Sequence, residues 1–180
     1  APTAKTGLVY DGDSHALVDP GTVSGGTMYY SLDESDWNTT VPTGTNAGNY
    51  RVYWKIVGDA DHVDVDQQDL SVTIGKKTPT LTVSPTSVTF TSSDVVNTTK
   101  EVQITYDGDG DFYYNYDDDN HDSGGIEMVS YSIDASTKKL TITRASDKTG
   151  NVTITVGTKA TTNYSSASQS ITVKFRSTAL

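Results

Sequence analysis

Apolar and polar residues alternate through most of this chain, and this alternation limits the possible folds more than any other feature. The segment NYRVYWKIV, residues 49–57, is typical, because one face of an extended strand would carry Tyr50, Val52, Trp54 and Ile56. The same pattern recurs in residues 69–74, 100–106, 129–133, 139–143, 151–156 and 170–175. No segment has the 3.6-residue period of a helix, and Gly, Asp or Asn separates the short strands. The pattern therefore predicts an all-β sandwich fold.

The segment GKKTPT, residues 75–80, divides the chain into two halves. It follows a predicted strand, and its proline cannot donate a hydrogen bond to a β-ladder. The halves also resemble each other, because AGNYRVYW at 47–54 and TGNVTITV at 149–156 each precede a last strand by a similar distance. We therefore predict two tandem β-sandwiches, residues 1–77 and 78–180, joined by a short linker.

Charge and composition exclude several functional classes. The 180 residues carry a net charge of −10, and an acidic surface repels phosphate backbones and anionic headgroups. No apolar run approaches the roughly 20 residues of a membrane helix. The absence of cysteine excludes disulfides, thiolate zinc sites and a cysteine nucleophile. We therefore expect no nucleic-acid partner and no membrane insertion.

An aspartate-rich stretch, YDGDGDFYYNYDDDNHDSGG at 106–125, is the first candidate site. Asp107, Asp109 and Asp111 alternate in a way that can supply oxygen ligands to calcium. An EF-hand loop counted from the first of them needs glycine at its sixth position and glutamate at its twelfth, and this chain has phenylalanine and aspartate there. The favoured interpretation is a hairpin turn that joins the strand ending at Tyr106 to FYYNY at 112–116. No metal is expected, and a weak calcium site is the alternative.

The sequence contains no recognisable arrangement of catalytic residues. The remaining acids of the stretch, Asp117, Asp118, Asp119 and Asp122, predict an exposed loop, since an acid-base pair needs one carboxyl in an apolar pocket. The three histidines, at positions 15, 62 and 121, lie in polar segments without ligand spacing, and no G-x-S-x-G motif occurs. We therefore expect neither an enzyme nor a cofactor.

The aromatic residues provide a different functional hypothesis. Exposed planar rings on a β-sheet face can stack on sugars, as in carbohydrate-binding modules, and Trp37 in the polar stretch DESDWNTT is the best candidate for such a ring. Trp54 shares its face with apolar residues, so we expect it in the core. The alternative function is therefore a carbohydrate-binding module, with or without calcium.

The segment NAGNY at 46–50 resembles the tyrosine corner of immunoglobulin-like sandwiches, in which a tyrosine entering strand F bonds back to the backbone. Residues 6–76 resemble the YDG/MBG-type immunoglobulin-like repeats of large bacterial surface proteins. The matching pieces are Tyr10-Asp11-Gly12, Gly25-Gly26-Thr27, YSLD at 30–33, Pro42 and Ala47-Gly48-x-Tyr50. Residues 78–176 resemble more loosely the broad bacterial immunoglobulin-like class, through LTVSPTSVTF, GNVTITV and ITVKF.

This resemblance implies repeated, non-enzymatic modules in stalks or adhesins on the outside of bacteria. It implies structural roles for Tyr50 and Trp54, and it makes neighbouring immunoglobulin-like domains of the same parent chain the expected partners, with a host glycan or protein as a further possibility. The start, APTAKTG, is neither a signal peptide nor an initiator methionine, so we expect a mature product or an excised fragment of a longer chain.

Overall fold

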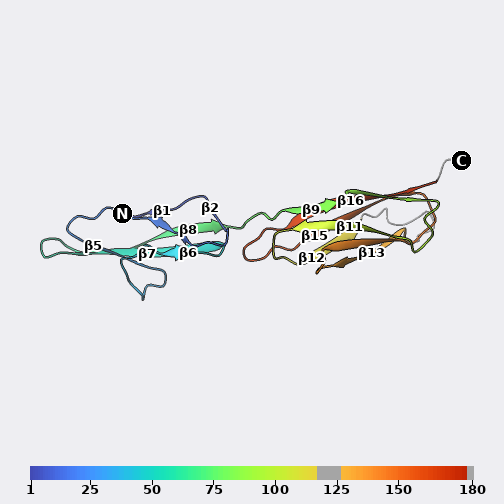
Figure 1. The fold of residues 1–180 in the computed structure, drawn as a ribbon. Helices are drawn as coiled ribbons and strands as arrows, with labels where there is room; N and C mark the ends of the chain where they lie inside the picture. Colours follow the sequence, from blue (N-terminus) through green and yellow to red (C-terminus); the bar gives the residue numbers. More distant parts are fainter. Residues whose placement is uncertain (117–126, 178–180) are drawn as a thin grey trace. The chain divides into compact units, whose positions relative to one another are not determined.

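The computed structural model describes residues 1–116 and 127–177, and the chain divides into two compact units, residues 1–77 and 78–180 (Figure 1). The described residues form strands, turns and loops and contain no helix. Accordingly, no helix in these ranges is long and apolar enough to cross a membrane.

The described residues of unit 2, which spans 78–180, form a sandwich of two four-stranded sheets. One sheet has the order β13-β14-β11-β9, and its strands are β13 (Val129–Asp134), β14 (Lys139–Arg144), β11 (Thr99–Tyr106) and β9 (Leu81–Ser84). The other has the order β10-β16-β15-β12, and its strands are β10 (Ser87–Thr91), β16 (Ala167–Arg176), β15 (Gly150–Thr158) and β12 (Phe112–Tyr116). In the immunoglobulin convention, β9, β11, β14 and β13 correspond to strands A, B, E and D of one sheet, and β12, β15 and β16 correspond to strands C, F and G of the other. The remaining strand, β10, lies at the edge of the second sheet beside β16.

The core of unit 2 lies between its two sheets. Seventeen buried apolar side chains of the described residues form one cluster, in which the rings of Phe90 and Phe175 stack with their centroids 5.5 Å apart. The alternating residues noted in the sequence supply this cluster, because successive side chains of a strand point to opposite faces of its sheet.

Unit 1, residues 1–77, has one sheet of four strands with the order β2-β8-β7-β5. Its strands are β2 (Leu8–Val9), β8 (Val65–Gly75), β7 (Gly48–Gly58) and β5 (Gly26–Ser31). The opposite layer consists of two short ladders, in which β1 (Thr3–Ala4) pairs with β4 (Val18–Asp19) and β3 (His15–Ala16) pairs with β6 (Thr43–Gly44). Leu17 joins the ladders, because its N–H donates to the Pro42 carbonyl and its carbonyl accepts from the Lys5 N–H, both at 2.9 Å.

The structure confirms the predicted all-β fold of two immunoglobulin-like sandwiches, and each alternating segment lies within a long strand. The hairpin predicted for residues 107–111 is wrong. The strands β11 and β12 that flank this loop belong to different sheets, so the loop crosses the sandwich. Gly108 and Gly110 do not have positive φ angles. They allow a close approach instead, because a Cβ would lie 2.4 Å from the Tyr106 hydroxyl oxygen at the first and 2.0 Å from the Lys159 carbonyl oxygen at the second.

Candidate functional site

Tyr50 has the geometry of a tyrosine corner. It lies near the start of β7, and its hydroxyl donates a 2.8 Å hydrogen bond to the Asn46 carbonyl. Its ring lies against Gly44, where an added Cβ would come within 2.7 Å of a ring carbon. The bond and the glycine together tie the turn before β7 to the ladder of β6, so Tyr50 holds one end of the unit 1 sandwich.

The two tryptophans have different surroundings. Trp54 of β7 is partly buried and packs against the unit 1 core, in the same inward row as the fully buried Val52. Trp37 is also partly buried, its indole N–H donates to the Glu34 carbonyl at 3.0 Å, and the Lys55 ammonium nitrogen lies 4.2 Å from the ring centroid. An ammonium group at this distance is a cation–π contact. One face of the Trp37 ring is therefore already occupied by Lys55.

The three alternating aspartates bond in different directions. The Asp107 carboxylate accepts from the Thr80 N–H at 2.6 Å, and the Asp109 carboxylate accepts from the Thr161 hydroxyl at 2.6 Å. Asp111 accepts from the Lys159 N–H through its backbone carbonyl. Among the described residues, no group of three acidic, histidine or cysteine side chains is placed to hold a metal ion. Asp117, Asp118, Asp119, His121 and Asp122 lie outside the described residues.

The two described histidines each contact a nearby aspartate on the surface. His15 lies 2.8 Å from an Asp11 oxygen, and His62 lies 2.6 Å from an Asp59 oxygen. A hydrogen bond from the backbone of Asp13, with one from His15, lowers the pKa of Asp11, and the bond from His62 lowers the pKa of Asp59. These pairs are local in sequence and exposed, so in the described part of the chain they stabilise loops and form no catalytic triad.

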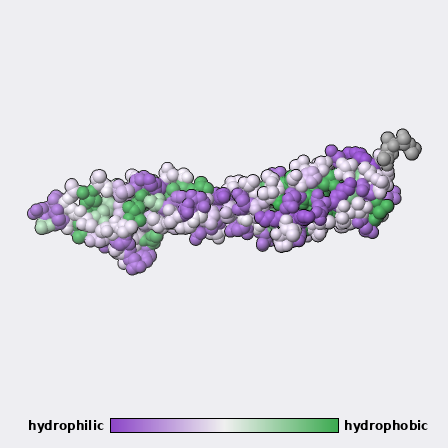
Figure 2. All heavy atoms as spheres, viewed as in Figure 1, coloured by the Kyte–Doolittle hydropathy of each residue, from purple (hydrophilic) through white to green (hydrophobic). Residues whose placement is uncertain are grey.

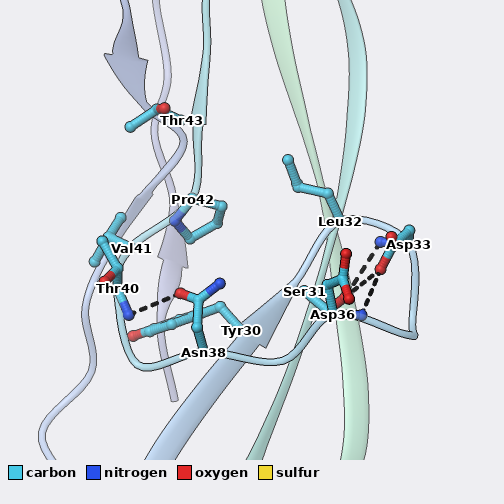
Figure 3. Close-up of a pocket in the computed structure, with 10 residues that line it drawn as sticks. All are labelled: Tyr30, Ser31, Leu32, Asp33, Asp36, Asn38, Thr40, Val41, Pro42 and Thr43. Atoms are coloured by element: carbon cyan, nitrogen blue, oxygen red, sulfur yellow. Dashed lines mark hydrogen bonds between the residues drawn. The ribbon is translucent and has the colours of Figure 1, made fainter.

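A shallow cleft of about 470 Å³ opens in unit 1 between the end of β5 and the segment that follows it (Figure 3). The Asp33 carboxylate at its edge accepts three hydrogen bonds of 2.9 Å, from the Asp36 and Ser35 N–H groups and from the Ser31 hydroxyl. These bonds hold the pKa of Asp33 well below its usual range. The carboxylate therefore fixes a turn, and it is a poor proton acceptor.

A second cleft, of about 580 Å³, lies at one end of unit 2. Three loops form it, namely those that join β11 to β12, β13 to β14 and β15 to β16. It is lined by Tyr106, Gly108, Asp109, Gly110, Asp111, Phe112, Tyr114, Ile133, Ala135, Lys138 and Lys159. The Asp-Gly repeats in the sequence indicate one of these loops, but no pattern in the sequence indicates that the other two lie beside it.

No known family model matches the chain, and no curated protein matches it. Solved structures with a similar fold include fibronectin(III)-like modules of Clostridium thermocellum CbhA, at 14% identity and a TM-score of 0.37, covering 98% of this chain and 95% of that one. Drosophila N-cadherin EC1-3 has 12% identity and a TM-score of 0.38 over 87% of this chain, which spans 57% of that fragment. The titin I-band fragment I67-I69 has 16% identity and a TM-score of 0.38, with 98% and 64% covered. At such low identities and scores, these structures carry no information about activity or partners.

Proposed function

We propose that this chain is a non-catalytic spacer or adhesive segment of a larger bacterial cell-surface protein. Residues 1–77 and 78–180 act as its two domains, and its nearest partners are neighbouring immunoglobulin-like domains of the same parent chain. The resemblance of residues 6–76 to YDG/MBG-type repeats supports the bacterial and extracellular assignment. Tyr50 and Trp54 have structural roles in this proposal, and no cofactor is involved.

The observation that carries the proposal is the pairing of the strands near the two ends of each unit. In unit 2, β10 pairs in parallel with the last strand, β16, over five register positions from Ser87↔Thr172 to Thr91↔Arg176. In unit 1, β2 pairs in parallel with the last strand, β8, over two positions. Tension applied through the chain ends pulls parallel partners in opposite directions along their length. The interstrand bonds are then loaded together in shear rather than broken one at a time, which suits a segment that bears load.

Single-molecule stretching of the whole chain between terminal handles tests this proposal. At about 3.4 Å per extended residue, unfolding of unit 1 releases about 260 Å of chain and unfolding of unit 2 about 350 Å. We expect two separate unfolding events, with the longer one at the higher force because its parallel ladder has more pairs.

A matched control changes only the direction of the load on unit 2. One handle moves to a cysteine at Ser93, just after β10, and the other stays at the C-terminus. Because β10 and β16 are parallel, these points lie at the same end of the ladder, and pulling separates the pairs one after another. The unfolding force should fall severalfold. Equal forces in the two geometries, or unfolding of both units at forces typical of such peeling, would refute the spacer function.

A further inference from the structure

We propose that the unit 2 cleft binds an uncharged oligosaccharide. The inference goes beyond the spacer function, because a spacer needs no ligand. The cleft volume of about 580 Å³ falls within the range of about 300–1,000 Å³ that is usual for ligand pockets. Three features of the cleft favour such a ligand, namely its fixed rim, a lining without net charge and its exposed aromatic side chain.

The rim of the cleft is held in place before any ligand arrives. The Tyr106 hydroxyl is buried and accepts a 2.9 Å hydrogen bond from the Gly110 N–H. Asp107 bonds to Thr80, Asp109 bonds to Thr161, and both glycines of the loop pack too closely on their neighbours to carry a side chain. A loop fixed in this way loses little conformational entropy on binding.

The lining carries hydrogen-bond donors and acceptors without net charge. Its ionised groups are two lysines and two aspartates, which balance within a chain whose net charge is −10. Lys138 donates to the Tyr106 carbonyl at 2.7 Å, and Asp109 accepts from Thr161. The Lys159 ammonium and the Asp111 carboxylate have no side-chain partner within the ranges that the structure describes. One free donor and one free acceptor on a single rim match a ligand that offers hydroxyl groups.

The lining of the cleft also includes an apolar surface. Phe112 and Ile133 are partly buried against the unit 2 core, and Tyr114 is 46% exposed. The edge-to-face contact between Tyr114 and Tyr131, with centroids 4.7 Å apart, holds the exposed ring in position. An uncharged sugar has an apolar C–H face for such rings and hydroxyls for Asp111 and Lys159. An acidic peptide or a nucleic acid would meet the acidic surface of the whole chain, so the chemistry favours the neutral ligand.

The place of the cleft in the fold is consistent with recognition. It lies between the loops that join strands B to C, D to E and F to G in the immunoglobulin convention. Antibody variable domains bind antigen with loops at this end, including B–C and F–G. Trp37 of unit 1 is a weaker candidate for sugar stacking, since the Lys55 ammonium lies over its ring.

Titration of the ¹⁵N-labelled whole chain with neutral tetrasaccharides, observed by amide NMR, tests the inference. The probes are cellotetraose, maltotetraose, laminaritetraose, mannotetraose and xylotetraose, each to about 10 mM, a concentration that detects even millimolar affinity. At least one probe should shift the amide signals of Gly108, Gly110 and Lys159 saturably. Asp111→Asn and Tyr114→Ala should each weaken binding about tenfold, while Tyr114→Phe, which keeps the ring, should stay within about twofold of the wild type.

Asp147→Asn, an exposed substitution in the loop between β14 and β15, is the matched control and should leave the affinity unchanged. Retained thermal melting of unit 2 confirms that each variant is folded. The inference is overturned if no probe shifts these signals, if the shifts cluster around Trp37 or the unit 1 cleft, or if an acidic tetrasaccharide or peptide binds more tightly than every neutral probe. None of these outcomes bears on the spacer function, which is tested by force.

Discussion

The two units have the same general fold, yet different features hold them together. The described residues of unit 2 close a core of seventeen buried apolar residues between two four-stranded sheets. Unit 1 places its single four-stranded sheet opposite two ladders of two residue pairs each, and seven of its apolar residues are buried. Hydrophobic stabilisation scales with the apolar area removed from water, so we expect unit 1 to be the less stable of the two.

Unit 1 compensates with polar contacts on the outer face of its sheet. Lys55 lies over Trp37, Gln67 donates to the Glu34 carboxylate at 2.8 Å, and Arg51 pairs with Asp69 at 2.9 Å. Figure 2 shows hydrophilic and hydrophobic residues interspersed on the visible surface of each unit. Each exposed contact of this kind contributes little by itself, because solvent screens it. The comparison indicates that a short sandwich can persist with a small core if its loops are tied to the sheet from outside.

The largest expected effect comes from truncating one buried leucine in each unit. Leu17 and Leu140 are both fully buried, and Leu→Ala in a core costs about 2–5 kcal/mol. That loss approaches the whole stability of a small domain, so Leu17→Ala should unfold unit 1, whereas Leu140→Ala should leave unit 2 folded with a lower melting temperature. Both tryptophans of the chain lie in unit 1, so tryptophan fluorescence reports on that unit alone. A native fluorescence spectrum for Leu17→Ala would show that unit 1 is not the weaker domain.

The second prediction concerns how arginine is used in the two units. Arg144 is only 4% exposed, and its guanidinium donates to the carbonyls of Thr91, Asp94 and Ser146 at 2.5–2.7 Å. It therefore ties together two loops of unit 2. Arg144→Met would remove the three guanidinium hydrogen bonds that join these loops, at a cost of about 3 kcal/mol to unit 2.

Arg51→Met in unit 1 is the control for that change, because Arg51 is exposed and solvent screens its pair with Asp69, so the loss of stability should be far smaller. Urea titrations followed by resolved amide NMR signals of each unit measure both effects. Similar losses for the two arginines would mean that the buried guanidinium contributes no more than a surface pair.

The strands were predictable from the sequence because one buried face per sheet imposes a period of two on the residues. Their assignment to sheets was not. Asp-Gly pairs are compatible with a hairpin and with a loop that crosses the sandwich, and the local sequence does not distinguish them. The packing of Gly108 on the Tyr106 hydroxyl and of Gly110 on the Lys159 carbonyl accompanies the crossing. The contact of Gly110 depends on a residue about 50 positions away in the sequence.

Some features of the candidate sites could likewise be predicted from the sequence, and others could not. The turn NAGNY predicted a bond from Tyr50 to the nearby backbone, and the bond to Asn46 spans four residues. The polar neighbours of Trp37 suggested an open ring, but Lys55 covers one face of it from β7. The unit 2 cleft requires three loops that are separate in sequence, so no local pattern could reveal it. Contacts between residues close in sequence could therefore be predicted, whereas sites formed by residues far apart in sequence could not.

A smaller effect is expected at the tyrosine corner, which unit 1 has and unit 2 lacks, since Val152 occupies the position after the matching Gly-Asn pair. Tyr50→Phe removes the hydroxyl that donates to Asn46 and should cost unit 1 roughly 1 kcal/mol. Urea denaturation followed by tryptophan fluorescence measures this loss. Tyr29→Phe is the control, because the Tyr29 hydroxyl has no hydrogen-bond partner among the described residues, and its loss should stay within a few tenths of a kcal/mol. An unchanged urea midpoint for Tyr50→Phe would show that the tyrosine corner does not stabilise unit 1.

The smallest effect is a difference in acid sensitivity. Hydrogen bonds hold the pKa of a carboxyl below its usual range at Asp11, Asp33, Glu34, Asp59 and Asp69 in unit 1. In unit 2 the bonds from the Ser136 hydroxyl and the Thr137 N–H lower the pKa of Asp134 to about 2, and the bond from the Thr91 N–H lowers the pKa of Asp94.

A carboxyl whose pKa is lower in the folded state stabilises the fold above its unfolded pKa of about 4, and this stabilisation is lost as the pH falls through the folded pKa. Among the described residues, unit 1 has more of these groups and the smaller core, so it should lose structure at a higher pH than unit 2 during acidification from about pH 5 to about pH 2. Tryptophan fluorescence follows unit 1, and amide signals of buried residues such as Ile154 follow unit 2. Asp33→Asn should weaken the pH dependence of unit 1 alone, since the amide keeps an acceptor oxygen but no longer titrates. If unit 2 unfolds first, or if Asp33→Asn leaves the acid midpoint of unit 1 in place, the turn carboxylates do not set the acid limit of the smaller domain.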